Sequence, residues 1–356
     1  MLYYVGGMLT DYFGPARLLQ SYTVLIVVAL YAGFFIVRYA MPFFYRWMPH
    51  DRGREFAGNA EAAKGKPTGA GVFFITVFAL LCLLLVPLSP LQSGTLVLTW
   101  LMMLTGFLDD RSVHSWGEYR KALLDFVICL AAALFLAHAA RQSSPDGTIY
   151  FWLPFFTTQI AVHPVLYVVI AVVLLWASVN TTNCTDGVDG LSGTLVLVAL
   201  LTMGVIFYFI LGHIDIAAYL LVPHLADGAS WGAITFALAG VLMGYLWHNA
   251  FPSKVLMGDA GSRALGFYIG VCVLVSGNPF MILATSLIIF VNGGLGLLKV
   301  ALLRFFHISI LTNIRFPLHD HLKINCGWSP TQVLVKFLII QLLATVAIVG
   351  VLFKVR

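Results

Sequence analysis

Acidic residues are rare in this chain, and most of them fall in short polar segments between long apolar runs. The sequence has 15 Asp and Glu residues among 356. Two adjacent carboxylates repel each other unless a cation or a proton relieves the repulsion. The acidic groups, in chain order, are those of segment 46–66, Asp109 with Asp110, Asp186 with Asp189, Asp259, and Asp320 between two histidines. We predict that these groups face one compartment and form an active site.

The composition shows which elements must position these groups. Hydrophobic residues make up 60% of the chain and charged residues 10%, and the mean hydropathy is +0.94. Apolar runs near the ~20 residues that span a bilayer recur from end to end, whereas a membrane barrel would show short alternating segments. We therefore predict an all-α polytopic membrane protein, with a single integral membrane domain over residues 1–356. No cleavable signal peptide is expected, and the five scattered cysteines predict neither a disulfide framework nor a zinc site.

The chain divides into about ten predicted spans of membrane length. They are residues 20–45, 69–90, 93–108, 119–139, 164–180, 190–212, 231–249, 262–277, 279–304 and 330–353. Alternate counting places the following loops on one face: 46–66, 109–118, 181–189, 250–261 and 305–329. Lys and Arg are concentrated in these loops. Because positively charged loops stay in the cytoplasm, this face is predicted to be cytoplasmic and both termini to lie outside.

Two segments depart from a plain helical pattern. The outer loop 140–163 contains apolar and β-branched stretches at 148–152 and 157–160 around a proline, which predicts a short β-hairpin. The ninth span contains a cluster of Asn292, Gly293 and Gly294, which predicts a bend. Asp125 lies inside the fourth span and is expected to face the bundle interior, near Arg120 or Lys121.

Two polar motifs combine carboxylates with glycine. Asp109 and Asp110 end the third span and suit either a divalent metal or a basic role, although an ordinary polar helix end has the same pattern. The segment 180–191 links two spans and contains Asn183, Asp186, Asp189 and Gly190. Its glycines allow tight turns and close approach of a ligand. Its side chains suit binding of a sugar or base, and a capped interhelical turn is the plainer alternative.

Asp259 opens the eighth span in the motif Met257-Gly258-Asp259-Ala260-Gly261-Ser262-Arg263. The exposed amides of a helix amino terminus favour phosphate, and a carboxylate there can hold Mg²⁺ between helix and phosphate. The alternative is a simple helix cap by Asp259 or Ser262.

Two further motifs could handle phosphate. His319 and His321 flank Asp320 in the last inner loop and could contact phosphate, move a proton or bind a metal. Zinc is not expected, because no further Cys or His has suitable spacing. Lys64 and Lys66 stand before a glycine-rich turn that includes Thr68, although they also suit a positively charged flank. The segment lacks a nucleotide-hydrolysis pattern.

The order of these motifs along the chain resembles that in the polyprenyl-phosphate N-acetylhexosamine-1-phosphate transferases, which are of the glycosyltransferase family 4 type. The resemblance covers residues from about 46 to 356. Within that superfamily the chain is most similar to the branch that transfers phospho-N-acetylmuramoyl-pentapeptide from UDP to undecaprenyl phosphate. That resemblance implies a phosphoglycosyl transferase that uses Mg²⁺ and releases lipid I and UMP in peptidoglycan synthesis.

The resemblance also implies roles for individual residues. The implied catalytic residues are Asp109, Asp110, Asp259 and His319, and Asp259 is the implied Mg²⁺ ligand. The implied substrate-binding residues are Lys64, Lys66, Thr68, Asn183, Asp186, Asp189, Gly190, Leu256, Gly258 and His321. Three positions depart from the family pattern: Asp320 replaces a histidine, Ala63 replaces a lysine, and Leu256 replaces a residue that is often aromatic. Lys64 and Lys66 are the candidates to replace the missing lysine, and stacking on uracil would be lost at Leu256.

The implied partners are UDP-N-acetylmuramoyl-pentapeptide, undecaprenyl phosphate and the lipid bilayer, with no nucleic acid. A homodimer is left open. The implied location is the bacterial cytoplasmic (inner) membrane, with the site on its cytoplasmic face. The alternatives are a transferase that uses UDP-N-acetylglucosamine and, more remotely, a cation transporter with carboxylates along its path. Direct transfer and a phospho-aspartate intermediate both remain open.

Overall fold

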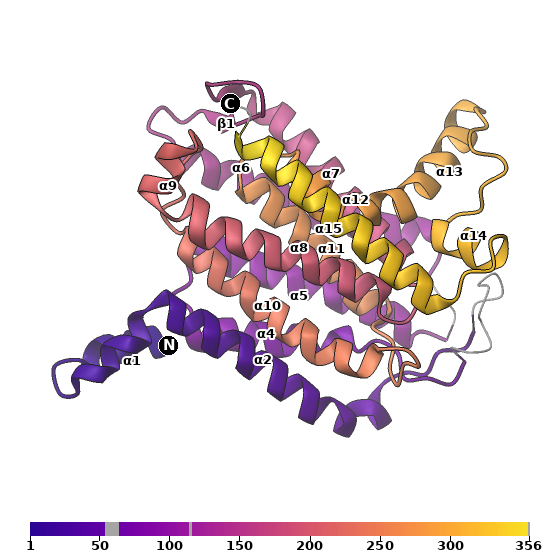
Figure 1. The fold of residues 1–356 in the computed structure, drawn as a ribbon, viewed down its shortest axis with the longest axis horizontal. Helices are drawn as coiled ribbons and strands as arrows, with labels where there is room; N and C mark the ends of the chain where they lie inside the picture. The colour runs from indigo at the N-terminus through magenta and orange to yellow at the C-terminus, as the bar shows by residue number, and fades with distance from the viewer. Residues whose placement is uncertain (54–63, 114–115, 355–356) are drawn as a thin grey trace.

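The computed structural model describes residues 1–53, 64–113 and 116–354, and within them it is an all-helical membrane bundle with one β-hairpin (Figure 1). Among these described residues, nine helical segments are long and apolar enough to cross a membrane, and the shorter apolar helix Gly71–Leu85 is the tenth. The ten segments are α2 (Tyr22–Phe44), α4 (Gly71–Leu85), α5 (Pro90–Arg111), α6 (Glu118–Ser143), α7 (Pro164–Thr185), α8 (Leu191–Val205) continued by η3 (Ile206–Leu211), α10 (Gly228–Asn249), α11 (Gly258–Val275), α12 (Met281–Ile289) continued by η4 (Phe290–Gly294) and α13 (Leu295–Phe306), and α15 (Pro330–Lys354). The predicted polytopic α-helical fold is confirmed.

The boundaries of several spans differ from the predicted ones, and α7 runs on to Thr185 through residues predicted as the start of loop 181–189. The differences at α5 and α4 have local causes or affect the span length most. Helix α5 begins at Pro90 because Ser89 forms a capping box with Gln92 and Pro90 suits the first helical position. At 22 residues it is longer than the predicted span 93–108. Helix α4 has 15 residues and is shorter than the predicted span 69–90.

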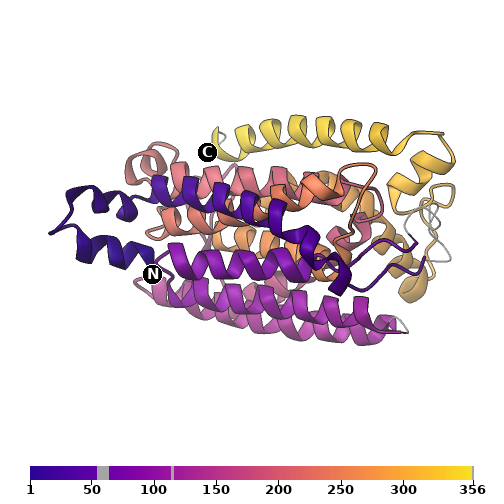
Figure 2. The same ribbon diagram turned by 90° about the horizontal axis from the view of Figure 1, so that it is seen from below.

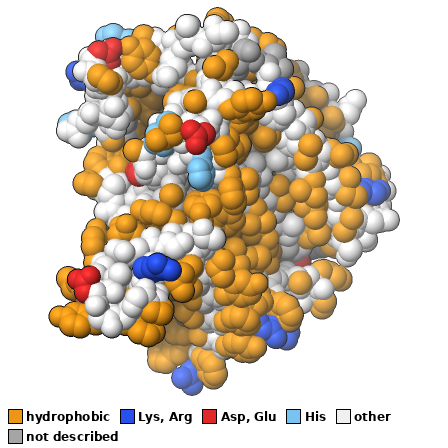
Figure 3. Space-filling view, turned by 60° about the vertical axis from the view of Figure 1, so that its left-hand side comes forward, with side chains coloured by type: hydrophobic (Ala, Val, Ile, Leu, Met, Phe, Trp, Pro, Cys, Tyr) orange, Lys and Arg blue, Asp and Glu red, His pale blue; other side chains and the backbone are white. Residues whose placement is uncertain are grey.

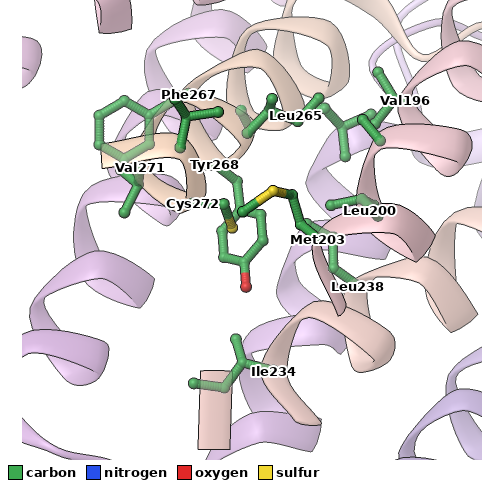
Figure 4. Close-up of a cluster of buried hydrophobic side chains, with 14 of the residues drawn as sticks. Val196, Leu200, Met203, Ile234, Leu238, Leu265, Phe267, Tyr268, Val271 and Cys272 are labelled. Atoms are coloured by element: carbon green, nitrogen blue, oxygen red, sulfur yellow. The ribbon is translucent and has the colours of Figure 1, made fainter. Parts of the chain in front are cut away.

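Helix α11 lies at the centre of the bundle, and glycines let its neighbours approach closely. A Cβ atom on Gly71 of α4 would lie 2.1 Å from the backbone N of Gly261, and one on Gly106 of α5 would lie 2.4 Å from the carbonyl O of Asp259. Small residues at such contacts are typical of membrane helix packing. Further along its length, α11 packs through Leu265, Tyr268 and Cys272 into an apolar cluster with α8 and α10 (Figure 4). This packing fixes the position of the amino terminus of α11, which carries Asp259.

The glycine cluster of the ninth span breaks the helix, as predicted. The backbone of α12 departs from helical angles at Ser286, and Asn292, Gly293 and Gly294 lie in the π-helical segment η4. A Cβ atom on Gly293 would lie 2.6 Å from the carbonyl O of Thr181, so η4 packs closely against α7. Helix α13 then points away from the bundle (Figure 1).

The outer loop forms the predicted hairpin. Strands β1 (Ile149–Phe151) and β2 (Ile160–Val162) pair antiparallel, with Ile149 opposite Val162. The second strand begins at Ile160, the last residue of the predicted stretch 157–160, so the two overlap by that one residue. All five cysteines are free, so the expectation of no disulfide framework is confirmed.

Both termini lie towards the same end of the bundle, opposite the end that carries α13 and α14 (Leu318–Ile324) (Figures 1 and 2). This agrees with an even number of spans. Short elements outside the spans were not predicted: α1 (Leu2–Leu9), η1 (Gly14–Gln20), η2 (Tyr45–Trp47), α9 (Ile214–Tyr219) and α14. Hydrophobic side chains dominate the surface, with few charged ones between them (Figure 3), as expected for helices that face lipid.

Candidate active site

The carboxylates of two distant motifs meet around one lysine. Lys121, in the first turn of α6, donates to Asp259 Oδ2 at 3.1 Å and also forms a close ion pair with Asp109. Both carboxylates are buried, with 6% and 2% of Asp109 and Asp259 exposed. The other oxygen of Asp109 accepts the backbone N–H of Trp116 at 2.7 Å. We call Asp109, Lys121 and Asp259 the carboxylate–lysine cluster.

Lys121 is the residue of this cluster that sequence reasoning missed as a site residue. A usable signal was present, because buried carboxylates need a cationic partner, and Lys121 stands in the first turn of the helix that follows the Asp109 motif.

Asp110 has a different role from its neighbour. Its two carboxylate oxygens accept the backbone N–H groups of Asp259 and Ala260, each at 3.0 Å. These are unpaired first-turn amides of α11, where a negative charge is favoured. Gly258 makes the contact possible, because its φ is +68° and a Cβ there would lie 2.3 Å from Asp110 Oδ2. The cap of α11 therefore comes from α5, and not from Asp259 or Ser262 as the plainer alternative had it.

The segment after α7 joins the same site. Asn183 Oδ1 accepts from Ser262 Oγ at 3.0 Å, which ties the last turn of α7 to the first turn of α11. Gly190 adopts a φ of +77°, and its N–H donates to Asn249 Oδ1 at 2.9 Å. Asn249, at the end of α10, also donates to the carbonyl of Val255 at 2.8 Å and was not anticipated from the sequence. Asp186 ends α7 as its carboxy-terminal cap.

A second polar cluster surrounds Asp189. Its carboxylate accepts the backbone N–H and the hydroxyl of Ser253 at 2.9 and 2.8 Å. Lys66 lies 3.7 Å from the same carboxylate and donates to Ser253 Oγ at 2.9 Å. Lys66, and not Lys64, therefore connects the glycine-rich turn to the segment 180–191.

The turn after Lys66 is held against the Asp259 motif by backbone hydrogen bonds. The N–H of Leu256 donates to the carbonyl of Pro67 at 2.8 Å, and the N–H of Ala70 donates to the carbonyl of Leu256 at 3.2 Å. Thr68 is buried. Lys64 is exposed and lines a cleft with Arg52 and Arg111 among others. Ala63 and the acidic residues Glu55 and Glu61 of segment 46–66 lie outside the described residues.

His319 is held rigidly in the interior. Its backbone N–H donates to Asn292 Oδ1 at 2.8 Å, and the Nδ2 of the same amide lies 3.1 Å from His319 Nδ1. The same Nδ1 also lies 3.2 Å from Asn292 Oδ1, so the amide holds one edge of the ring and leaves Nε2 on the opposite edge. That nitrogen faces Gly187, where a Cβ would lie 2.4 Å from it. Burial lowers the pKa of His319 from 6.5 to about 4, although Asp320 acts in the opposite direction. The imidazole is therefore neutral at pH 7 and can donate a hydrogen bond but not a charge.

The other two residues of this motif bind their surroundings. Asp320, which replaces a histidine of the family pattern, forms an ion pair with Lys323 at 3.0 Å. His321 Nδ1 accepts the backbone N–H of Arg315 at 3.3 Å. His319 alone of the three turns towards the segment 180–191.

The donor set of the carboxylate–lysine cluster fits a hard cation. Its acidic members offer carboxylate oxygens, which are the ligands of hard cations, and the positive group of Lys121 lies between Asp109 and Asp259. Within the described residues no group of three or more His, Cys, Asp or Glu side chains could hold a metal ion by itself. This suits Mg²⁺, which takes one or two carboxylates and completes its shell with water and substrate phosphates.

Asp125 faces the bundle interior, as predicted, but its ion-pair partner was not predicted. It forms a buried ion pair with Arg263 of α11, and not with Arg120 or Lys121. The sequence alone could not show this, because the two residues lie on helices that are adjacent only in the fold.

Comparison with known proteins agrees with this geometry. The model of glycosyl transferase family 4 matches residues 93–277, more than half of the chain. The phospho-N-acetylmuramoyl-pentapeptide-transferase of Treponema pallidum subsp. pallidum is 58% identical over 345 residues, covering 97% of this chain and 94% of the relative. The chain belongs to the phospho-N-acetylmuramoyl-pentapeptide transferases of glycosyl transferase family 4.

More distant members of this family cover the chain as completely. The enzymes of the same name from Campylobacter curvus and Campylobacter hominis are 30% and 28% identical over 97% of the chain. The family match includes Asp109, Asp110, Asn183 and Asp259, whereas Lys66 and the motif around His319 lie outside the matched residues. The match therefore covers the carboxylate–lysine cluster. The structure shows that Lys66 and His319, which lie outside the match, both approach the segment 180–191.

Proposed function

We propose that this chain transfers phospho-N-acetylmuramoyl-pentapeptide from UDP-N-acetylmuramoyl-pentapeptide to undecaprenyl phosphate, with formation of lipid I and UMP. The observation that carries the proposal is the meeting of Asp109 and Asp259 around Lys121 at the ends of membrane helices. The names of full-length relatives, 58% identical in the first case, identify the sugar nucleotide.

The position of the site suits two unlike substrates. One substrate is soluble and anionic, and the other is a phosphate on a long lipid. A cluster at the ends of α5, α6 and α11 lies at headgroup depth, where both can reach it. The positive loops at this end of the bundle support a cytoplasmic site in the bacterial inner membrane.

The reaction needs a nucleophile held in line with a diphosphate. An oxygen of the lipid phosphate attacks the β-phosphorus of the UDP-sugar, a new P–O bond forms, and the bond to UMP breaks. We assign the orienting or proton-accepting role to Asp109, because it shares Lys121 with Asp259, whereas both oxygens of Asp110 accept backbone amides of α11. Lys121 would then bind the phosphate charge that accumulates beside Asp109 and Asp259.

Asp259, with Asp109 beside it, would hold Mg²⁺ when the substrates bind. The ion supplies positive charge that screens two polyanions from each other. The chain's own contribution is the rigid placement of Asp259 by the Asp110 cap and by the close approach of α4 and α5 to α11.

The remaining groups would bind the sugar nucleotide. The segment 180–191 and Lys66 form the second polar cluster, which suits the uridine and the diphosphate. The neutral imidazole of His319 would form a hydrogen bond with the substrate through Nε2. This revises the expectation that His319 neutralises phosphate charge, because burial disfavours its charged form.

Two alternatives are less well supported. A transferase of UDP-N-acetylglucosamine would share the chemistry, but the full-length relatives carry the other name. A transporter would need carboxylates deep in several spans, whereas Asp125 is the one acidic residue well inside a span among the described residues, and Arg263 neutralises it. A homodimer stays a prediction, which the mass of the detergent-solubilised protein would test.

The test uses the purified full chain in detergent with undecaprenyl phosphate and each sugar nucleotide in turn. We expect Mg²⁺-dependent release of UMP with UDP-N-acetylmuramoyl-pentapeptide, and a lipid product with the mass of lipid I. The Asp259→Asn variant should lose activity about 100-fold or more while it keeps its melting temperature. A preference for UDP-N-acetylglucosamine, or full activity of Asp259→Asn, would overturn the proposal.

A further inference from the structure

A buried ion pair lies one helical turn deeper in the membrane than the carboxylate–lysine cluster. Asp125 follows Lys121 by four residues on α6, and Arg263 follows Asp259 by four residues on α11. One turn is about 5.4 Å along the helix, so each new residue lies on the same helix face as the cluster residue before it. Asp125 and Arg263 are each 1% exposed and form a close contact through Oδ1 and Nη2.

Stability is a poor explanation for this pair. Burying two charges costs more than their attraction recovers unless their hydrogen bonds are satisfied. Within the described residues, Nε and Nη1 of Arg263 have no hydrogen-bond partner, although both are buried. A pair built for stability would use the guanidinium in two parallel hydrogen bonds. Charged groups inside a membrane more often serve function.

The pair removes a competitor for Lys121. Lys121 and Asp125 are four residues apart on one helix, which is the spacing at which opposite charges pair on a helix surface. Lys121 nevertheless contacts Asp109 and Asp259, which belong to other helices. Asp125 is engaged by Arg263 instead.

We propose that Arg263 and Asp125 are positioning residues for the cluster. By engaging Asp125, Arg263 keeps Lys121 directed at Asp109 and Asp259. Asp125 in turn keeps Arg263 away from Asp259, its own neighbour one turn earlier on α11. This inference rests on the proposed function, since its main measurement is the transfer reaction.

The order of the charges matters as much as their presence. Along α6 the positive residue comes first and the negative one second, whereas along α11 the order is reversed. Lys121 and Asp259 therefore each have an oppositely charged neighbour on their own helix and an oppositely charged partner across the gap. Exchanging Asp125 and Arg263 would keep the ion pair but place like charges next to Lys121 and Asp259.

Four variants separate positioning from a structural role: Arg263→Met, Arg263→Lys, the neutral double variant D125N/R263M, and the exchanged double variant D125R/R263D. In Arg263→Met, Asp125 is released, and we expect a fall in kcat of about tenfold or more. In Arg263→Lys the charge remains, and activity should stay within about threefold of the wild type. The neutral double variant has no competitor for Lys121 and should recover most of the activity lost in Arg263→Met. The exchanged variant should be as slow as Arg263→Met or slower, even though its pair is intact.

A direct readout of Lys121 accompanies the kinetics. The side chain of Lys121 is 28% exposed, so its acetylation rate can be followed by mass spectrometry in folded protein. If Lys121 turns to Asp125 in Arg263→Met, its acetylation slows, and the neutral double variant restores the rate. A purely structural pair would not change this rate at constant melting temperature.

Any one of three results would overturn the inference. These are a wild-type kcat in Arg263→Met, equal activity of the exchanged and neutral double variants, and an acetylation rate of Lys121 in Arg263→Met that equals that of the wild type. If Arg263→Met does not fold, the comparison of the two double variants decides in the same way. Failure of the proposed function is recognised separately, because the wild-type protein would then form no lipid product in the same assay.

Discussion

The carboxylate of Asp110 accepts the backbone N–H of Asp259 at 3.0 Å, across 149 residues of sequence. The second acidic group of the chain thus holds the fourth in place. Because Asp110 is bound to the start of α11, its neighbour Asp109 is left to share Lys121 with Asp259. Two adjacent aspartates therefore have separate tasks, one in positioning and one in the cluster.

Replacing Asp110 by Asn should weaken the cap of α11. We expect a fall in melting temperature of about 1–3 °C, because a capping carboxylate contributes roughly 1 kcal/mol. Transfer should fall more steeply than stability, because the amide moves Asp259. Asp146→Asn is the matched control, since Asp146 binds Ser144 and Tyr150 in the outer loop. Equal loss of transfer in both variants would count against a special role of Asp110.

Replacing Lys121 by Met should leave two carboxylates without their shared cation. We expect transfer to fall about 100-fold, as is common when a charged group aimed at reacting phosphate is lost. Lys336→Met is the control, because Lys336 is exposed and stacks on Trp328. The measurement is the rate of UMP release at saturating substrates. Retention of more than half the rate in Lys121→Met would remove Lys121 from the site.

Lys66 and Lys64 should differ in their effect on substrate binding. Lys66 contacts Asp189 and Ser253, whereas Lys64 is exposed. We expect Lys66→Met to raise the KM for the UDP-sugar about tenfold, and Lys64→Met to have a smaller effect. Steady-state kinetics at fixed lipid concentration measures both. The reverse order would show that Lys64 replaces the lysine absent at position 63.

Stability should depend on pH through His319. Burial lowers its pKa from 6.5 to about 4 in the folded protein. Between these two values the unfolded chain binds the proton more readily, so the free energy of unfolding rises with pH across this window and is highest above it. Acidification from pH 7 towards pH 4.5 should therefore lower the melting temperature of the wild type more than that of His319→Gln. The exposed His224 provides the control, and His224→Gln should follow the wild type. Parallel curves for all three proteins would contradict the burial argument.

The sequence by itself determined the class of fold, the number of spans and the face that carries the acidic motifs. These follow from local properties: apolar length sets a span, alternate counting of the spans places the acidic loops on one face, and glycine permits the turns at Gly190 and Gly258. The hairpin and the break near Gly293 were predictable for the same reason. The boundaries of α4 and α5 were less predictable. In α5 the capping box at Ser89 extends the helix beyond its apolar run.

Only the tertiary structure decided which charges pair. Asp110 caps a helix, Lys121 joins the cluster, Arg263 takes Asp125, and His319 is buried and neutral. None of these follows from spacing along the chain, because each depends on how neighbouring helices are rotated and how closely their glycines let them approach. Sequence motifs show which side chains are available for chemistry. The packing of the helices around α11 decides which partner each of these side chains contacts, and the partner determines the charge state and the role of the side chain.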